Sequence, residues 1–427
     1  MASPRPSSNV LPPPADDRDL LTSLPEEMVS QILERLPVKD AVRTSALATP
    51  WRRRWASCLG LRFAFSGGDR PAAVDAVLAA YSCIFCELFI VIPIGWAARW
   101  VSAIAAKGVK SLTLSFVVNS RFKSVLPSQL FSCTTITKLE LRGCYIPPLP
   151  TFFQGFPKLV DLCLQGITFP KHGMKTLEKL ISTSPLLTVL RIIYPVIERD
   201  GDSAPYDDWV IQAPKLTSIE IRSREDYGWQ VEDLPLLKQA EVRLQGLQLL
   251  RVLSAMTRVT HLFVDLAYDG ILLCQPSYFI NLTELSVFAM FNQSAQILSV
   301  LYMIVSAPKL ENLHITIIHE TYEDGVEVDM TFLDVKKIGL LSQLKFCKFD
   351  GVMGHSSEVQ FLEFLISKAK LLQKVEVSLH DESFTDTEVL STEILNFEKA
   401  SSRAEIVVNS FLGYHSDMSS DEDEPEN

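Results

Sequence analysis

The chain has 427 residues, 47% of them hydrophobic and 21% charged, which is a globular balance with room for a large core or two to three domains. Its formal net charge of −11 argues against a nucleic-acid-binding protein, whose binding face is basic. The first residues, MASPRPSSNVLPPPADD, lack the apolar core of a signal peptide, and their proline, serine and aspartate content predicts a disordered leader over 1–18.

The stretch from Asp19 to Trp55, DLLTSLPEEMVSQILERLPVKDAVRTSALATPWRRRW, has the sharpest pattern in the chain. Ser23 and Glu26 form a capping-box pattern with Pro25 in the first turn, followed by an apolar stripe that ends at Leu36-Pro37. We expect a second short helix around 40–45 and a third over 46–55. Three short helices bury little surface, so a partner or the rest of the chain is expected to cover part of their apolar face.

The same stretch resembles the F-box of plant-type F-box proteins with leucine-rich repeats. The shared pattern is LxxLPxExxxxILxxLPxKDAVRTSxLxxxWRxxW, which starts here at Leu21, and the departure is Thr49-Pro50, where the family has a Ser-Lys or Ser-Arg pair. This departure removes a charge and adds a helix breaker. A helical cap that closes the end of a solenoid would explain the apolar stripe but not the complete F-box-like sequence pattern.

The resemblance implies docking to a Skp-family linker within a cullin–RING ubiquitin ligase. Some of the apolar residues of the F-box must instead hold its helices together, and the sequence does not sort them. The candidate linker-binding residues are Leu24, Pro25, Ile32, Leu33, Leu36, Val42, Leu47 and Trp51.

The basic cluster Trp51-Arg52-Arg53-Arg54-Trp55 has two readings. It is compatible with nucleic-acid contact or nuclear import. On a helix, however, the two tryptophans would be i,i+4 neighbours that pack inward while the arginines face solvent. The overall acidity favours this structural reading.

Two apolar stretches, 72–95 and 295–307, are not membrane spans, because charges and Pro93 interrupt the first and the second is too short. The first divides into a helix that starts at Pro71 and a strand over about 85–92, and the second predicts a buried helix. The eight cysteines are scattered, which favours reduced, mostly buried thiols in a protein of the cytoplasm and/or nucleus. A lone Cys83-x-x-Cys86 lacks the second pair or nearby histidines of a zinc site. No cofactor or metal is expected.

One phrase, apolar-x-x-apolar-x-apolar, recurs along the rest of the chain, as in Leu187-TV-Leu190-R-Ile192. Its central residues lie 21 to 34 residues apart from Leu112 to Val375, mostly in or near the leucine-rich-repeat range of roughly 20–29. One strand is expected at each occurrence of this pattern: 85–90, 109–114, 136–141, 159–164, 187–192, 216–221, 237–242, 259–264, 282–287, 310–315, 344–349, 372–377 and, weakly, 406–408.

The connecting segments contain helical patterns at 174–183, 247–256, 295–307 and 359–369. Each strand must reach the next through a crossover, so the sheet is expected to be parallel. A doubly wound α/β domain also alternates strands and helices, but it rarely repeats one phrase a dozen times. The predicted fold class is α/β, a leucine-rich-repeat solenoid with a parallel sheet and convex helices or loops, preceded by a small three-helix F-box.

The residues between the apolar pairs of each strand should face the concave surface. The candidate substrate-binding residues are Arg191, Glu220, Glu241, Phe263, His314 and Lys348, with Ser286 and Glu376 in the same positions of other repeats. Acidic loops at 194–209 and 319–330 are compatible with a basic partner or with plain solvated connections.

The segment from Leu344 to Val377 resembles the FBD module at the end of many plant F-box/repeat proteins, through Phe349-x-Gly351, Gly354 and Glu358, among other positions. It predicts a strand, a glycine-rich turn, a helix and a strand. A plain terminal repeat fits equally. The predicted division is a leader (1–18), F-box (19–65), repeat array (66–343), FBD-like terminal repeats (344–410) and an acidic disordered tail (411–427).

The sequence contains no phosphate-binding glycine loop, no His-x-x-x-His pair and no Gly-x-Ser-x-Gly elbow. We therefore expect a chain without catalysis of its own. The resemblance implies an adaptor whose F-box docks a Skp-family linker and whose repeats bind a protein substrate, without nucleic acid or membrane. The alternatives are an interaction scaffold independent of a ligase and a small-molecule receptor on the same scaffold, which would need a deep concave pocket.

Overall fold

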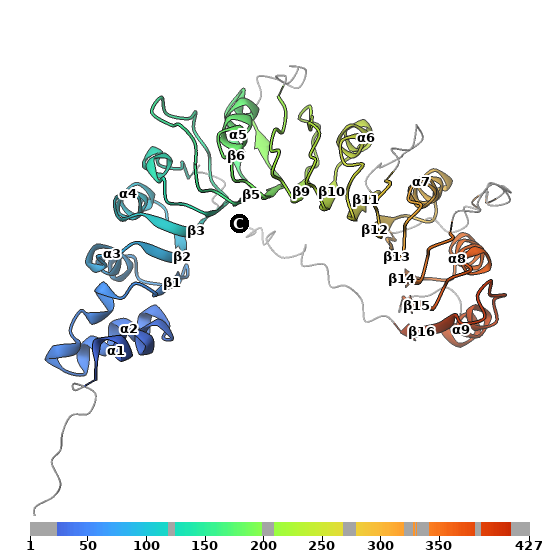
Figure 1. Ribbon diagram of the computed structural model, residues 1–427, viewed down its shortest axis with the longest axis horizontal. Helices are drawn as coiled ribbons and strands as arrows, with labels where there is room; N and C mark the ends of the chain where they lie inside the picture. Colours follow the sequence, from blue (N-terminus) through green and yellow to red (C-terminus); the bar gives the residue numbers. More distant parts are fainter. Residues whose placement is uncertain are drawn as a thin grey trace, which may run out of the picture.

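Parallel strands form one continuous curved sheet, ordered along the sheet as they are along the chain (Figure 1). The computed structural model describes residues 24–117, 124–198, 209–267, 279–319, 328, 330, 341–380 and 386–410. The strands of this sheet are β1 (Arg62–Phe65), β2 (Phe85–Ile92), β3 (Val109–Phe116), β4 (Lys138–Arg142), β5 (Asp161–Gln165), β7 (Val189–Ile193), β9 (Ser218–Arg222), β10 (Gln239–Arg243), β11 (His261–Asp265), β12 (Glu284–Ala289), β13 (Asn312–Ile317), β14 (Phe346–Val352), β15 (Lys374–Leu379) and β16 (Glu405–Ser410). A short pair, β6 (Thr168–Phe169) and β8 (Val196–Ile197), lies apart from it.

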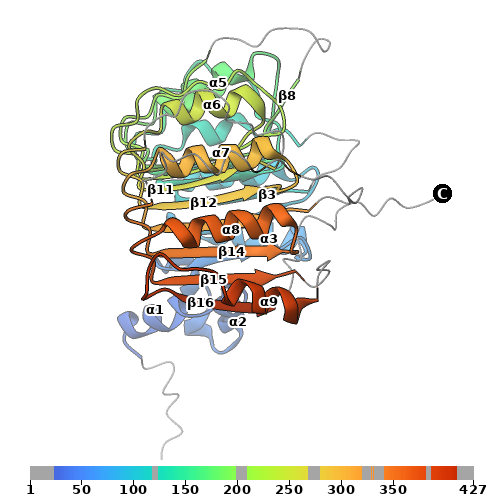
Figure 2. The same ribbon diagram turned by 90° about the vertical axis from the view of Figure 1, so that its right-hand side faces the viewer.

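The sheet lines the inner side of an arc, and helices cover its outer side (Figures 1 and 2). These helices are α3 (Pro71–Ala80), α4 (Ala97–Lys107), α5 (Gly173–Ser182), α6 (Gly246–Ser254), α7 (Ser294–Val305), α8 (Ser356–Lys368) and α9 (Thr387–Leu395), with a 3₁₀ turn, η4 (Ser128–Ser132). None of the helices in the described ranges is long and apolar enough to cross a membrane.

The repeated phrase explains the arc. Its alternating apolar residues point into the core between sheet and helices, as Leu190 and Ile192 do in β7, both with 0% exposure. The strands pair in register, so that Leu162, Leu190 and Ile219 lie side by side. Stacking the units thus builds one continuous apolar core, which no single repeat could bury alone.

Threonines before several strands tie neighbouring repeats together. The Thr217 hydroxyl donates to the Thr188 carbonyl at 3.1 Å, and the Thr283 hydroxyl donates to the Thr260 carbonyl at 3.1 Å. The same carbonyls accept backbone N–H groups from the next repeat, as Thr188 does from Thr217 and Ser218. The recurring Leu-Thr of the phrase therefore supplies a side-chain ladder at the entry to the sheet.

The predicted repeat strands and the four predicted convex helices are confirmed. The strand β1 and the helices α4 and α9 were not predicted from the sequence. The strand β1 begins at Arg62, so the sheet already starts within the range that the sequence assigned to the F-box. At the other end, β14 and β15 continue the sheet from β13 without a break.

The N-terminal unit differs from its predicted form in two places. It consists of α1 (Glu26–Glu34), α2 (Val38–Arg43) and the 3₁₀ turns η1 (Thr44–Ala46), η2 (Thr49–Trp51) and η3 (Arg54–Ser57). Pro25, with ψ 149°, precedes α1, so Glu26 opens the helix and is not at the third position of a capping box. Ser23, the other half of that pattern, lies outside the described residues.

The third predicted helix, over 46–55, is wrong. Ala48 is extended, Pro50 follows at the first turn, and Arg53 adopts the left-handed conformation with φ 68°, so the segment forms two separate 3₁₀ turns. Trp51 and Trp55 are nevertheless buried, with 2% and 4% exposure. The inward packing of these tryptophans was predicted correctly, but from the wrong local structure.

The cysteines follow the prediction where they are described. Five are buried and free, and burial raises the pKa of Cys144 to about 12. Cys83 precedes β2 and Cys86 lies within it, and both are half-buried. Cys274 lies outside the described residues, as do the leader, the acidic tail and most of the two acidic loops.

Candidate functional site

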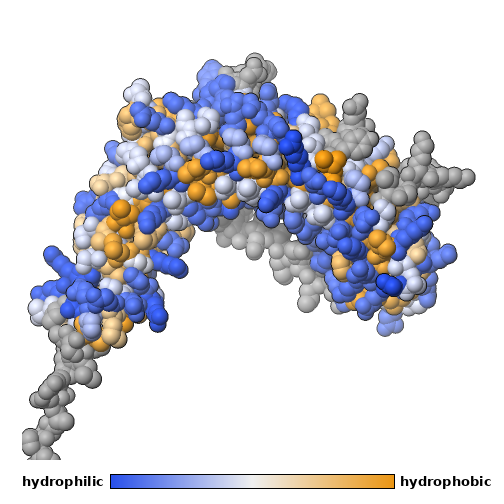
Figure 3. Space-filling model, viewed as in Figure 1, coloured by the Kyte–Doolittle hydropathy of each residue, from blue (hydrophilic) through white to orange (hydrophobic). Residues whose placement is uncertain are grey.

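The F-box unit exposes several large apolar side chains. Met28 and Ile32 are 50% and 40% exposed, and they are i,i+4 neighbours on one face of α1. Leu47 and Leu59 are 59% and 67% exposed. The space-filling view shows hydrophobic surface at the outer end of this unit, between strongly hydrophilic side chains (Figure 3).

The predicted linker-binding residues divide into a surface set and a core set. Pro25, Ile32 and Leu47 are exposed, while Leu24, Leu36 and Val42 are half-buried against the core. Leu33 and Trp51, with 1% and 2% exposure, belong to the core itself. These two residues therefore offer no surface to a partner in this conformation; they hold the unit together.

Hydrogen bonds attach the F-box unit to the first repeat. The Tyr81 hydroxyl donates to the Cys58 carbonyl at 2.8 Å, and the backbone N–H of Ser82 donates to the Ala56 carbonyl at 2.9 Å. Within the unit, Trp55 Nε1 donates to Ser45 Oγ at 3.1 Å. The Arg54 guanidinium lies 5.6 Å from the Trp51 ring centroid, while Arg52 and Arg53 are exposed. The basic cluster is thus built around two buried tryptophans.

The predicted concave residues lie in one row across the sheet. Strand register pairs Arg191 with Glu220, Glu220 with Glu241, and Glu241 with Phe263. The row continues through Ser286, His314, Lys348 and Glu376. All of these side chains are half-buried, as expected for residues on the open face of a curved sheet. The structure thus brings the predicted set together, although nothing in it assigns them a ligand.

A second row, two residues further along each strand, was missed. It includes Arg222 and Arg243, which the register pairs, and Asp265, which follows the last residue of β11 that is paired with β10. The sequence did contain a sign of this row, since the residue that follows the last apolar residue of the repeated pattern is charged in several repeats. The pairing between strands was not visible in the sequence.

The two rows form a network of ion pairs in the middle of the arc. Arg222 lies 2.7 Å from Glu220 and 2.9 Å from Glu241, and Arg243 lies 3.0 Å from Glu241 and 3.9 Å from Asp265. Burial, and then the neighbouring Glu241, raise the pKa of Glu220. Burial also raises the pKa of Asp265. Charges of both signs therefore cancel locally, and the surface is not a simple acidic or basic patch.

An aromatic pair lies within this network. The rings of Phe263 and Phe288 meet edge to face with centroids 4.8 Å apart, and the Arg243 guanidinium stacks at 4.7 and 5.2 Å from them. Arginine stacked on aromatic rings combines apolar area with a charge, which is typical of protein-binding surfaces.

A shallow depression of about 300 Å³ lies at the C-terminal end of the concave face. Its walls include His314, Lys348, Phe346 and Lys374. His314 Nε2 and Lys348 Nζ lie 2.7 and 2.6 Å from Asp350 Oδ2. Burial alone would raise the pKa of Asp350, but the hydrogen bonds from His314, Lys348 and Ser378 outweigh it and lower that pKa to about 2. The depression is open and at the small end of the size range of ligand pockets.

Three family models match successive parts of the chain. The F-box domain model covers residues 21–62, the model described as FBD-associated F-box protein At5g56370, LRR repeats covers 97–245, and the FBD model covers 339–377. Together they match the N-terminal helical unit, a large part of the strand array and the β14–α8–β15 segment.

Curated relatives carry the same combination of parts. The chain is 25% identical to F-box/FBD/LRR-repeat protein At1g13570 of Arabidopsis thaliana, over 91% of this chain and 98% of that protein. It is 22% identical to F-box/FBD/LRR-repeat protein At1g78750 over 91% and 96%, and 22% identical to FBD-associated F-box protein At4g10400 over 91% and 99%, both also from Arabidopsis thaliana.

The fold and the matches define a class of protein in which a small helical F-box is joined to a leucine-rich-repeat solenoid that ends in an FBD segment. This chain belongs to that class, as a plant F-box/LRR/FBD protein. Its F-box and repeats support an adaptor-like role.

Proposed function

We propose that the chain is the substrate-recognition subunit of a Skp–cullin–F-box ubiquitin ligase. The F-box docks a Skp-family linker, and the concave face of the repeats holds a protein substrate. The chain itself performs no bond chemistry, and it acts by raising the concentration of the substrate near the transfer centre. Its place of action would be the cytoplasm and/or nucleus.

The observation that carries this proposal is the exposed apolar surface of the F-box unit. Met28, Ile32 and Leu47 remain 40–59% exposed, although Val29, Leu33 and Val38 of the same unit are buried. Contiguous exposed apolar surface on a folded domain is characteristic of a protein-binding site. Covering it would contribute roughly 25 cal/mol for each Å² of apolar area removed from water.

Binding of a purified Skp-family linker to the full-length chain tests the first half of the proposal. The double variant Ile32→Asp/Leu47→Asp places charges at exposed positions, so it should leave folding intact while weakening linker binding more than tenfold. Leu33→Asp is unsuitable for this purpose, because Leu33 is 1% exposed and its loss would unfold the unit.

Leu236→Asp is the matched control, because Leu236 is also apolar and 52% exposed but lies in the repeat array. It should bind the linker as the unmodified chain does. If the F-box double variant binds the linker as tightly as the unmodified chain does, the docking model is wrong. No linker binding by the unmodified chain would instead favour a repeat scaffold that works without a ligase.

The proposed substrate surface rests on the concave ion-pair network and its aromatic pair. Charged side chains of a protein partner can replace the internal partners of these residues. A substrate would therefore be selected by how well its charges match those of the concave face. Proximity labelling with and without proteasome inhibition, comparing the unmodified chain with Phe263→Ala, would identify proteins that accumulate on this face. Substrates whose labelling does not depend on Phe263 would argue against it as the contact surface.

A further inference from the structure

Three histidines and one glutamate meet at the edge where the strands β13, β14 and β15 end. His319 follows β13 by two residues, His380 directly follows β15, and His355 and Glu358 lie at the start of α8, after β14. Carboxyl ends of neighbouring parallel strands share one edge of a sheet, and this is where α/β proteins commonly place ligands. The group is distinct from the concave face and from the exposed face of the F-box.

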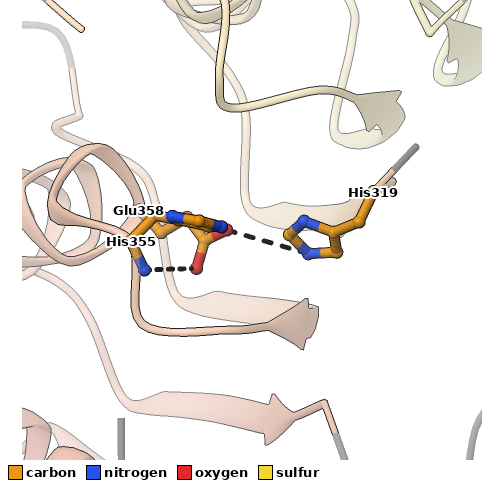
Figure 4. A group of neighbouring side chains, drawn as sticks. All are labelled: His319, His355 and Glu358. Atoms are coloured by element: carbon orange, nitrogen blue, oxygen red, sulfur yellow. Dashed lines mark hydrogen bonds and ion pairs between the residues drawn. The ribbon is translucent and has the colours of Figure 1, made fainter. Parts of the chain in front are cut away.

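Three members of the group are arranged around a common point. One ring nitrogen of His319, one of His355 and one carboxylate oxygen of Glu358 all lie within 4.8 Å of one another (Figure 4). The ring centroids of His319 and His355 are 6.0 Å apart, and those of His319 and His380 are 5.9 Å apart. The side chains of His319 and Glu358 are 11% and 1% exposed, so these two are shielded from water, while His355 and His380 are half-buried.

Glu358 is held rigidly by one of its two carboxylate oxygens. Oε2 accepts backbone N–H groups from Met353 and Gly354 at 2.9 Å each, and from His355 at 3.3 Å. The other oxygen, Oε1, has no hydrogen bond within the described structure, and Nε2 of the His319 ring lies 3.7 Å from it. A buried carboxylate oxygen without a hydrogen bond destabilises the fold by roughly 1–3 kcal/mol, and a cation bound beside it would remove this penalty.

His319 is oriented by a backbone carbonyl. Its Nε2–H donates to the Gly351 carbonyl at 2.7 Å, which places the lone pair of the neutral ring on Nδ1. Gly351 has φ +82°, and a Cβ there would approach the Ile317 carbonyl oxygen to 2.7 Å, so this turn requires glycine. A histidine whose second nitrogen donates to a carbonyl is the usual arrangement of a metal ligand.

The protonation states also suit a cation. Burial lowers the pKa of His319, and the neighbouring His355 and His380 lower it further. Burial raises the pKa of Glu358 to about 7. Burial thus favours the neutral forms of His319 and Glu358, and a bound positive ion would favour the ionised carboxylate.

We propose that His319, His355 and Glu358 form a binding site for a divalent transition-metal ion of the zinc type. Two imidazoles and one carboxylate are ligands typical of zinc, whereas magnesium and calcium prefer oxygen alone. Zinc bonds of about 2.0–2.2 Å place tetrahedral ligand atoms roughly 3.3–3.6 Å apart, so these ligand atoms, now up to 4.8 Å apart, need to approach one another by up to about 1.2–1.5 Å. The ion would tie together the turns after β13 and β14.

Equilibrium dialysis of the tag-free, full-length chain against Zn²⁺ tests this site. We expect one Zn²⁺ per chain, a rise in Tm that a chelator reverses, and a visible absorption band when Co²⁺ replaces Zn²⁺. Glu358→Gln keeps an oxygen for the three backbone N–H groups, and His355→Asn keeps a good helix cap. Each should weaken zinc binding more than tenfold.

His261→Ala is the matched control. His261 Nε2 lies 3.1 Å from Glu284 Oε2, but this pair is half exposed and forms no three-ligand group with any other residue that the structure describes. The control should bind Zn²⁺ as the unmodified chain does. The proposal is overturned if the unmodified chain holds no stoichiometric zinc, or if His355→Asn binds it as tightly. Circular dichroism establishes that each variant is folded, and His355→Asn carries the test if Glu358→Gln is not.

Discussion

The F-box unit and the concave face of the repeats are built for contact in opposite ways. The F-box leaves large apolar side chains in water, with Leu47 at 59% exposure. The concave face pairs its charges within the chain, so that Arg243 contacts Glu241 and Asp265 and stacks on Phe263. The first surface leaves apolar area exposed that a partner could bury, whereas the charged side chains of the second are already paired within the chain.

This difference bears on affinity and on selectivity. Burying apolar surface stabilises a complex almost regardless of the partner's detailed charge pattern, and added salt does not weaken it much. Exchanging internal ion pairs for intermolecular ones contributes little net free energy, but it penalises wrong partners strongly. The F-box is thus suited to one constant partner, and the concave face to selection among many.

The contrast breaks if the F-box core and surface residues behave alike. Leu33→Ala should lower the free energy of unfolding by about 2–5 kcal/mol, because it opens a cavity among buried side chains. Ile32→Ala, one residue away and 40% exposed, should change it by less than about 0.5 kcal/mol. Urea unfolding followed by the fluorescence of the buried Trp51 and Trp55 measures both. Equal losses would mean that Ile32 is part of the core.

The repeat strands were predictable because one short sequence pattern is enough to identify each of them. Alternating apolar residues define both the strand and the face that it buries, as in Leu190 and Ile192. The strand β1, RFAF, was missed because it is a single short member at the end of the array. The helix predicted over 46–55 does not form because Ala48 is extended and Arg53 is left-handed, and the sequence revealed neither conformation.

The functional surfaces were predictable only in part. The central concave row follows from alternation within each strand, so it could be named in advance. The ion pairs depend on which strand lies next to which, and Arg222 with Glu241 joins two strands. His319, His355 and Glu358 come from two successive repeats, and the spacing between those repeats is too irregular to show that they meet.

The concave network provides a second, smaller test of the contrast. Arg243→Ala should lower the free energy of unfolding by about 2 kcal/mol, because Asp265, with a side chain 5% exposed, loses its cation. Adding Asp265→Asn should recover part of the loss, since the amide oxygen can keep the hydrogen bond from the Ala267 N–H. A thermodynamic double-mutant cycle gives the coupling.

The comparison variant for this cycle is Arg251→Ala. Arg251 and Asp226 form an ion pair at 2.7 Å, with both side chains 46% exposed. Such a pair is expected to contribute no more than about 1 kcal/mol. If Arg243 and Arg251 prove equally dispensable, the concave pairs are ordinary surface pairs and the face is not internally satisfied in energetic terms.

The smallest effect is expected from pH, at Asp350. Its pKa is lowered to about 2 in the folded chain, so the stability it contributes is complete above the unfolded value near 3.8 and is lost as pH falls through both values. The difference between the unfolded and folded pKa of Asp350 corresponds to about 2 kcal/mol of folding stability. About 1 kcal/mol of this should be lost between pH 6 and pH 3. Urea midpoints measured across this range for the unmodified chain and Asp350→Asn should therefore converge as pH falls. A constant gap would mean that His314 and Lys348 hold Asp350 without favouring its charge. This end of the concave face would then differ from the paired network at its centre.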